Sequence, residues 1–300
     1  MRTMREDSLV SVVITTYKRP IEVLKRAVES VVNQTYNNTE IIVVNDYPED
    51  KFNATKIREM LLAFPNKTIQ YIEPEHNSGA CAARNMGLSI ANGAYIAFLD
   101  DDDYWLNEKI EIQLSGFCAD DIGVVYTPYY LKYKDKQEIV RTDAISGKLT
   151  ESLLYRNTMC IFPLMRTSLV RKLGGFDVEL TASQEHDLLL RLSEICDFNF
   201  VDKPTAVYDV SEESISMNIP KKIKAFEMFQ AKHKELYNSY PDALYYQIIR
   251  MVNNMNNAGQ YKYALRLWKK AIKIKPFSAS NIIQPIKGYI KRLMRRKAFH

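Results

Sequence analysis

Four consecutive carboxylates, Asp100 to Asp103, directly follow the apolar run 94–99. This run is β-branched and aromatic, and its length suits a buried strand better than a helix. Because a sheet interior does not tolerate four like charges, the strand must end at Asp100. Side by side, the carboxylates repel one another and need a positive partner. The obvious candidate is a hard divalent cation such as Mn²⁺ or Mg²⁺, held by oxygen ligands and shared with a phosphate.

The spacing Asp100-x-Asp102 at a strand end suits a nucleoside diphosphate with a bound metal. One carboxylate can reach a ribose hydroxyl or a metal-bound water, and the next can bind the cation that bridges the two phosphates. The structural alternative is a solvated acidic turn, or a helix start with Asp103 as its cap. The buried strand before the run and the aromatic pair Tyr104-Trp105 after it favour the metal site. Asp103, the last of the four, is expected to cap the helix that follows.

Three further positions carry groups that could act on a substrate. The segment 184–187 (QEHD) precedes an apolar helical pattern. Acidic groups at a helix start are often only partners of the helix dipole, but a transferase needs a base that deprotonates its nucleophile. Asp46 follows an apolar strand and can accept the ring N–H of uracil or cap a turn. Arg84 can contact a nucleotide or pair with the aspartate cluster, and these two roles are compatible.

An alternation of strand and helix patterns over the first 130 residues must position these groups. The order predicts an α/β fold with a mostly parallel sheet and helices on both faces, and ligands then bind beyond the carboxyl ends of the strands. Strands are expected at 9–15, 40–45, 68–72, 94–99 and 123–130, and helices at 20–32, 51–64, 78–91 (with Ser78 as cap) and 106–117. The segments 15–19, 45–48, 73–77 and 100–103 would then share one edge of the sheet.

The later part of the chain is less regular. A turn is predicted at 174–177, a helix at 184–195 and a strand at 198–210. From about residue 219 the pattern is helical. Residues 259–276 match the second helix of a tetratricopeptide repeat, but because one repeat does not stand alone, a helix pair packed on the main domain is preferred.

The bulk composition is that of a globular protein with 300 residues, 46% hydrophobic and 26% charged. No apolar run approaches the roughly 18 residues that span a bilayer, and no signal peptide is recognisable, so we expect a cytoplasmic protein. The cysteines, at 81, 118, 160 and 196, form no CxxC pair, which argues against zinc and for buried, reduced thiols.

The net charge of +5 hides an uneven distribution. The last 58 residues carry 13 lysines and arginines and no acidic side chain, whereas residues 1–242 carry 28 basic and 36 acidic side chains. Within this tail, residues 286–297 have the pattern of a basic amphipathic helix. Such a helix suits an anionic membrane surface, with a solvated helix end as the alternative. Nucleic-acid binding is disfavoured because no recognition motif accompanies the charge.

Taken together, these segments resemble the family 2 glycosyltransferases, which have the GT-A fold. Any single piece is weak, but all of them in this order and spacing, over residues 9 to about 210, are specific. The matching pieces are VSVVITTY (10–17), QTY (34–36), 40–46, Asn77-x-Gly79 with Ala83-Arg84-Asn85, 93–105, GGFD (174–177) and 184–191.

The resemblance implies a role for each matching residue on the nucleotide side. Thr15, Tyr17 and Asp46 fall where the family holds the nucleoside base. Asn77 and Arg84 lie on a motif that serves the nucleotide sugar. We therefore expect three parts. The resemblance implies a nucleotide-sugar half at 1–130 and an acceptor half at 131–215, and the helical and basic pattern adds an extension at 216–300.

The resemblance also implies the metal and the chemistry. Asp100 and Asp102 fall on the DxD motif, with Asp102 on Mn²⁺ or Mg²⁺ and Asp101 at the variable middle position near the ribose. Glu185 falls on the catalytic base, which takes the proton of the acceptor hydroxyl as that hydroxyl displaces the diphosphate with inversion. The expected donor is a UDP-sugar, and the expected acceptor is a glycan or lipid-linked sugar of a bacterial surface polysaccharide.

The alternatives are a sugar nucleotidyltransferase and a non-catalytic binding or scaffold module. A sugar nucleotidyltransferase would need a glycine-rich phosphate loop after the first strand, and residues 15–20 contain no glycine. A non-catalytic binding or scaffold module would bind neither UDP nor Mn²⁺.

The chain departs from the family pattern at the base-binding end. It has Asn45-Asp46 where two acidic residues are usual, Tyr47-Pro48 where Gly-Ser is usual, and Lys18 where Asn is common. The metal motif is unaffected by these departures.

Overall fold

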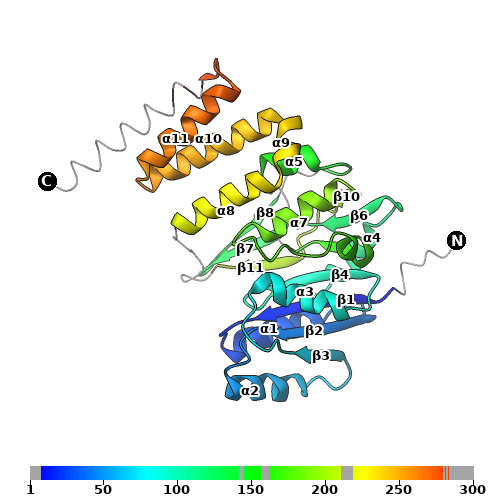
Figure 1. Ribbon diagram of the computed structural model, residues 1–300. Helices are drawn as coiled ribbons and strands as arrows, with labels where there is room; N and C mark the ends of the chain where they lie inside the picture. Colours follow the sequence, from blue (N-terminus) through cyan, green and yellow to red (C-terminus); the bar gives the residue numbers. More distant parts are fainter. Residues whose placement is uncertain are drawn as a thin grey trace. The chain divides into compact units, whose positions relative to one another are not determined.

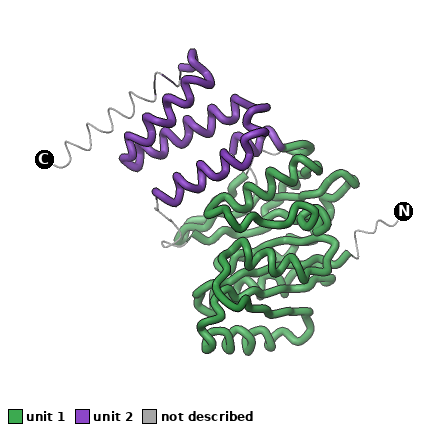
Figure 2. The backbone as a smooth tube through the Cα atoms, in the orientation of Figure 1, with its two compact units in different colours: residues 1–149, 158–217 green, residues 150–157, 218–300 purple. Residues whose placement is uncertain are grey.

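A computed structural model describes residues 8–141, 145–156, 162–210, 219–279, 281 and 283. The chain divides into two compact units, coloured separately in Figure 2. The first unit comprises residues 1–149 and 158–217, and the second comprises residues 150–157 and 218–300. The short stretch 150–157 therefore belongs with the C-terminal helices, although it precedes them by some sixty residues. The predicted boundary at residue 130 lies inside the first unit and stays a prediction.

The first unit is built on a seven-stranded sheet with the order β10-β6-β9-β4-β1-β2-β3 (Figure 1). Strand β9 runs antiparallel to β4 and β6, and the other described pairings in this sheet are parallel. The predicted mostly parallel sheet is thus confirmed. The strands are β1 (Val10–Thr16), β2 (Thr39–Asn45), β3 (Thr68–Ile72), β4 (Tyr95–Asp100), β6 (Ile122–Tyr126), β9 (Leu164–Arg166) and β10 (Asp197–Phe200).

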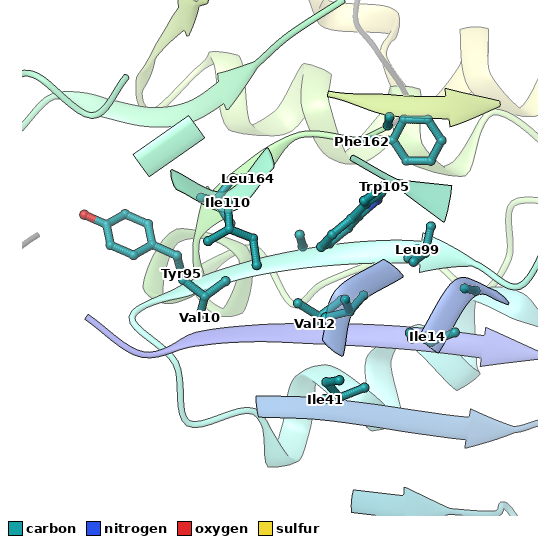
Figure 3. Close-up of a cluster of buried hydrophobic side chains, with 14 of the residues drawn as sticks. Val10, Val12, Ile14, Ile41, Tyr95, Leu99, Trp105, Ile110, Phe162 and Leu164 are labelled. Atoms are coloured by element: carbon teal, nitrogen blue, oxygen red, sulfur yellow. The ribbon is translucent and has the colours of Figure 1, made fainter. Parts of the chain in front are cut away.

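The two faces of this sheet are covered by helices. On one face, alternate β1 residues such as Val12 and Ile14 share a core with apolar side chains of α1, α2 and α4, and Trp105 lies in the same cluster (Figure 3). On the other face, Gly87 of α3 lies against Val13. Burial on both faces explains why the strand sequences are almost continuously apolar. The helices of this unit are α1 (Ile21–Val32), α2 (Lys51–Leu61), α3 (Ala80–Ile90), α4 (Lys109–Ser115), α6 (Thr167–Lys172) and α7 (Gln184–Ser193).

A smaller sheet has the order β5-β11-β7-β8, with β5 (Tyr104–Trp105), β11 (Ala206–Asp209), β7 (Tyr129–Tyr133) and β8 (Lys136–Val140). The single strands expected at 123–130 and 198–210 are therefore wrong, since each is two strands that belong to different sheets. Pro128 and Pro204 lie between the two strands in each case. Proline has no N–H for a strand ladder, so it marks the point where the chain changes sheet.

Two expected helix caps are also wrong. Helix α3 begins at Ala80 after Gly79, whose φ is 84°, and Ser78 donates both its backbone N–H and its hydroxyl to Asp46. Helix α4 begins only at Lys109, after Glu108. Asp103 is instead an acceptor for the backbone N–H of Asp209 at 3.0 Å, which joins β11 to the acidic segment.

The second unit is helical. Its helices are α5 (Thr150–Tyr155), α8 (Ile219–Lys232), α9 (Lys234–Ser239), α10 (Pro241–Asn257) and α11 (Tyr261–Ile274). The predicted helix pair is α10 and α11, which share an apolar core and are connected through Gly259 at φ 77°. The side-chain amide of Gln247 donates to the carbonyls of Leu154 and Tyr155, which fastens α5 to α10.

Three sequence expectations concern the basic segment, the cysteines and membrane-spanning helices. The basic segment 286–297 and Cys160 lie outside the described residues. Cys81, Cys118 and Cys196 are free thiols, and Cys118 is exposed rather than buried as expected. Among the helices that the structure describes, none combines the length and the apolar character required to cross a membrane.

Candidate functional site

A cavity of about 460 Å³ lies at the carboxyl ends of β1, β2 and β4, where the parallel sheet predicts a ligand site. The eight residues predicted for the nucleotide sugar and the metal all line it: Thr15, Tyr17, Asp46, Asn77, Arg84, Asp100, Asp101 and Asp102. The predicted base Glu185, at the start of α7, forms an ion pair with one of them, Arg84. The fold therefore brings together residues that are up to 170 positions apart in sequence.

Asp101 is the anchor of the acidic segment. It is only 4% exposed, and both of its oxygens are engaged. The Thr16 hydroxyl donates to Oδ2 at 2.6 Å, and Arg19 Nε donates to Oδ1 at 2.9 Å. Burial raises the pKa of Asp101 to about 6, against the opposing effects of Thr16 and Arg19. Asp101 thus fixes the acidic loop to the end of β1.

Arg19 is a residue that the sequence reasoning missed. Besides Asp101, its guanidinium donates from Nη2 to Asp102 at 2.9 Å. Arg19 lies in the segment 15–19, at the predicted ligand edge of the sheet, and this position could have identified it as a site residue. Burial raises the pKa of Asp102, and Arg19 opposes that rise. Arg19 therefore supplies positive charge beside two of the four carboxylates.

Asp103 points away from the cavity, toward β11. Burial and the nearby Asp100 raise its pKa to about 9. Arg26 supports the same corner, because it donates to the carbonyl of Asp102 and pairs with Asp209 at 2.7 Å. This corner connects the acidic segment to the smaller sheet.

Arg84 bridges the two halves of the candidate site. Its side chain is 7% exposed, and it pairs with Asp100 at 2.6 Å through Nη2 and with Glu185 at 3.0 Å through Nη1. Burial alone would lower the pKa of Arg84, but the two carboxylates outweigh it and the pKa is raised. Of the two roles left open for Arg84, pairing with the aspartate cluster is therefore present in the structure.

Asp46 is buried at the end of β2, and four donors reach its carboxylate. Oδ1 accepts from the backbone N–H and the hydroxyl of Ser78, at 2.8 and 2.9 Å. Oδ2 accepts from the Asn77 amide and the backbone N–H of Gly79, both at 2.9 Å. A carboxylate has about four lone-pair positions, so Asp46 holds the loop 77–79 with its full accepting capacity.

The chemistry of Asp100 and Asp102 fits a divalent cation. Their side chains are 50% and 25% exposed, and each uses one carboxylate oxygen in its ion pair with an arginine. Within the described residues there is no cluster of three or more His, Cys, Asp or Glu side chains arranged for a metal. Mg²⁺ and similar hard cations commonly take only one or two carboxylates and complete their shell with water and phosphate oxygens. Two carboxylates at the wall of an open cavity meet that requirement.

A mostly parallel α/β sheet that ends in an aspartate segment, joined through Arg84 to an acidic helix start, is the arrangement of a glycosyltransferase with the GT-A fold. The solved structures that share the fold agree. TarS from S. aureus, residues 1–349 in complex with UDP-GlcNAc, matches with a TM-score of 0.69 at 17% identity, over 96% of this chain and 92% of that one. The family model described as glycosyl transferase family 2 matches residues 11–173, and the chain belongs to this family.

Two other similar proteins show the range of this family and fold. The Escherichia coli UDP-Glc:alpha-D-GlcNAc-diphosphoundecaprenol beta-1,3-glucosyltransferase WfgD is 29% identical over 228 residues, which are 73% of this chain and 84% of WfgD. The mannosyltransferase PcManGT from Pyrobaculum calidifontis, in complex with GDP-Man and Mn²⁺, matches with a TM-score of 0.58 at 15% identity, over 95% of this chain and 86% of that one. The membership decides for the glycosyltransferase over the nucleotidyltransferase and the scaffold module.

Proposed function

We propose that this chain transfers a hexosyl or N-acetylhexosaminyl group from a UDP-sugar to a glycan or lipid-linked acceptor in the synthesis of a bacterial surface polysaccharide. The name of WfgD, which includes both UDP-Glc and an undecaprenol-linked acceptor, supports this substrate class. The UDP-GlcNAc complex of TarS supports the donor. Because PcManGT was solved in complex with GDP-Man, GDP-sugars should be tested beside UDP-sugars as donors.

The observation that carries the proposal is the bridge through Arg84, which connects Asp100 at the end of β4 to Glu185 at the start of α7. A donor site alone would explain the acidic strand end. The carboxylate of Glu185 on a separate element, 38% exposed and held 3.0 Å from Arg84, supplies the second function that a transfer to a hydroxyl requires.

In the proposed reaction, Thr15, Tyr17, Asn77 and Asp46 hold the nucleoside side of the donor, and Asp46 acts by ordering the loop 77–79. Asp102, with Asp100, would hold Mn²⁺ or Mg²⁺, whose positive charge offsets the charge that develops on the departing diphosphate.

Glu185 would take the proton of the acceptor hydroxyl while that oxygen forms a bond to C1 of the sugar. The bond from C1 to the diphosphate oxygen breaks on the opposite face, so the anomeric configuration is inverted.

Two other parts of the chain have roles in the proposal. The half at 131–215 would bind the acceptor, and the basic segment 286–297 would bind a membrane. We infer that the segment 286–297 holds the enzyme at the anionic inner face of the cell membrane, where a lipid-linked acceptor would be presented. Its lysines and arginines, without any acidic residue after Asp242, support an anionic lipid surface rather than a nucleic acid.

A donor screen tests the proposed function. UDP-, GDP- and CDP-sugars are supplied with an acceptor, and nucleotide release is followed with Mn²⁺, with Mg²⁺ and with EDTA. Asp102→Ala and Glu185→Gln should each lower transfer by roughly 10²-fold or more, whereas only Asp102→Ala should weaken metal-dependent UDP binding. The exposed Asp121→Asn and Glu194→Gln, the latter next to the C-terminus of α7, serve as controls and should keep full activity. Full activity of Asp102→Ala or Glu185→Gln would refute the role assigned to that residue.

A further inference from the structure

Tyr17, Lys18 and Tyr47 form a small cluster beside the cavity, which we call the tyrosine–lysine cluster. The rings of Tyr17 and Tyr47 meet edge to face with centroids 5.5 Å apart. The Lys18 ammonium lies 5.1 Å from the Tyr17 centroid and 4.6 Å from the Tyr47 centroid. Tyr17 is 46% exposed and also lines the cavity. Two departures from the family pattern, at positions 18 and 47, thus contact each other beside the donor site.

The backbone of Lys18 is in the left-handed region, with φ at 52°. Side chains with a Cβ are unfavourable there, and asparagine is among those that tolerate it best. Lys18 is also fully exposed, where a cation–π contact is weak and ordering a long side chain costs entropy. Lysine is therefore not the residue type that stabilises this turn best. An unfavourable backbone conformation beside a cavity indicates a binding role.

The charged side chains that line the cavity already have partners within the chain. The carboxylate of Asp46 is occupied by the four donors from the loop 77–79. Arg19 and Arg84 are engaged with the carboxylates at the diphosphate side. Tyr17 offers a ring on which a base can stack, and the Lys18 ammonium is the cationic donor held against that ring.

We propose that Lys18, held in place by Tyr17 and Tyr47, distinguishes uracil from cytosine in the donor site by donating to the carbonyl oxygen at C4 of uracil. An ammonium carries three donors and no acceptor. Uracil presents a carbonyl oxygen at C4, where cytosine presents an amino group, so Lys18 favours uracil over cytosine. This inference rests on the proposed function as a nucleotide-sugar enzyme and adds the residue that selects the base.

Calorimetric titration of the full chain with UDP and with CDP, both with Mn²⁺ present, tests the inference. Wild type should bind UDP about tenfold more tightly than CDP, as expected for one hydrogen bond gained and one unmatched amino group avoided. Lys18→Asn should lower UDP affinity about tenfold, leave CDP affinity within twofold, and keep or raise Tm. Tyr47→Ala, which removes one of the two rings against Lys18, should lower the UDP to CDP ratio in the same direction.

Lys134→Asn is a matched control. Lys134 also has a left-handed backbone, with φ at 54°, and its ammonium lies 5.5 Å from the Tyr133 centroid. It is in the turn between β7 and β8, and its partner Tyr133 does not line the cavity, whereas the Lys18 partner Tyr17 does. This variant should keep or raise Tm and leave both nucleotide affinities unchanged.

Three results would overturn the inference. If Lys18→Asn bound UDP as wild type does, Lys18 would not contact the base. If it lost UDP and CDP affinity equally, Lys18 would act only as a general positive charge. If wild type bound neither UDP nor CDP but bound GDP, the proposal of a UDP-sugar donor would itself fail. This outcome differs from the other two because it is seen in wild type, before any substitution is made.

Discussion

Replacing Arg84 by methionine tests whether the proposed donor site and the proposed catalytic base, Glu185, depend on each other. Methionine keeps a similar length and fills the buried position, but it removes both ion pairs of the guanidinium. The partner carboxylates of Asp100 and Glu185 are 50% and 38% exposed, so they remain solvated when Arg84 is gone. We therefore expect a folded protein with Tm close to that of wild type, in which Glu185 is no longer held in place.

The size of the effect on catalysis follows from the contact that is lost. A hydrogen bond to a charged group contributes about 1.5–3 kcal/mol, and the exposure of Glu185 places this one at the lower end. A loss of about 1.5 kcal/mol corresponds to roughly a tenfold fall in kcat. Removal of the base by Glu185→Gln should cost more, on the order of 10²- to 10⁴-fold. Arg84→Lys keeps the charge but cannot span both carboxylates with a planar fork, so its kcat should lie nearer to that of Arg84→Met than to wild type.

The decisive assay is a double-mutant cycle on kcat at saturating donor. If Arg84 positions Glu185, then Arg84→Met should lower kcat in the wild-type background and have little further effect in Glu185→Gln. Its contact with Asp100 should appear separately, as a higher donor KM. An equal fall in kcat in both backgrounds would show that Arg84 does not act through Glu185, and the bridge would then serve only donor binding.

Three further predictions concern the metal and the scaffold. Asp102→Asn should weaken UDP binding in Mn²⁺ more than tenfold by calorimetry, whereas EDTA should leave the Tm of wild type unchanged; a large fall in Tm with EDTA would contradict this. Gly87→Ala places a Cβ 2.4 Å from Cγ1 of Val13, so it should destabilise the fold by about 1–3 kcal/mol in urea unfolding, and Val13→Ala should recover part of that loss. The pKa of Glu40 is held below its ordinary value of 4.5, because hydrogen bonds led by that from the Ser11 hydroxyl outweigh the opposing effect of burial. A lowered pKa in the folded state stabilises the fold above pH 4.5 and loses that contribution as the pH falls. Glu40→Gln should therefore flatten the fall of Tm between pH 6 and pH 3, and an unchanged slope would contradict the assignment.

Local sequence patterns were sufficient for the parts of the fold that depend on burial alone. The apolar strands, their parallel order and the acidic segment at the end of β4 all follow from periodicity and from the exclusion of charge from a sheet interior. These patterns were enough to place Asp46, Asp100 and Asp102 at the cavity, whereas Thr15, Tyr17 and Asn77 were expected there from the resemblance to the family.

What could not be predicted depends on partners that are distant in the chain. Asp103 was expected to cap the following helix, but its partner is the backbone of Asp209, 106 residues later. Ser78 had the residue type of a helix cap, but it lies next to Asp46, which a pattern within one helix cannot show. In both cases a local hydrogen bond and a tertiary one competed for the same side chain, and the tertiary contact was formed.

The arginines change the interpretation of the acidic segment. Its charge suggested a cation as the necessary compensation, but Arg19 and Arg84 already lie beside Asp101, Asp102 and Asp100. Burial and the nearby Asp100 raise the pKa of Asp103, which disfavours a further negative charge there. The chain's own residues thus compensate part of the negative charge of this segment. We therefore expect the proposed divalent cation to serve the donor diphosphate rather than folding. For this reason metal removal should weaken nucleotide binding without lowering Tm.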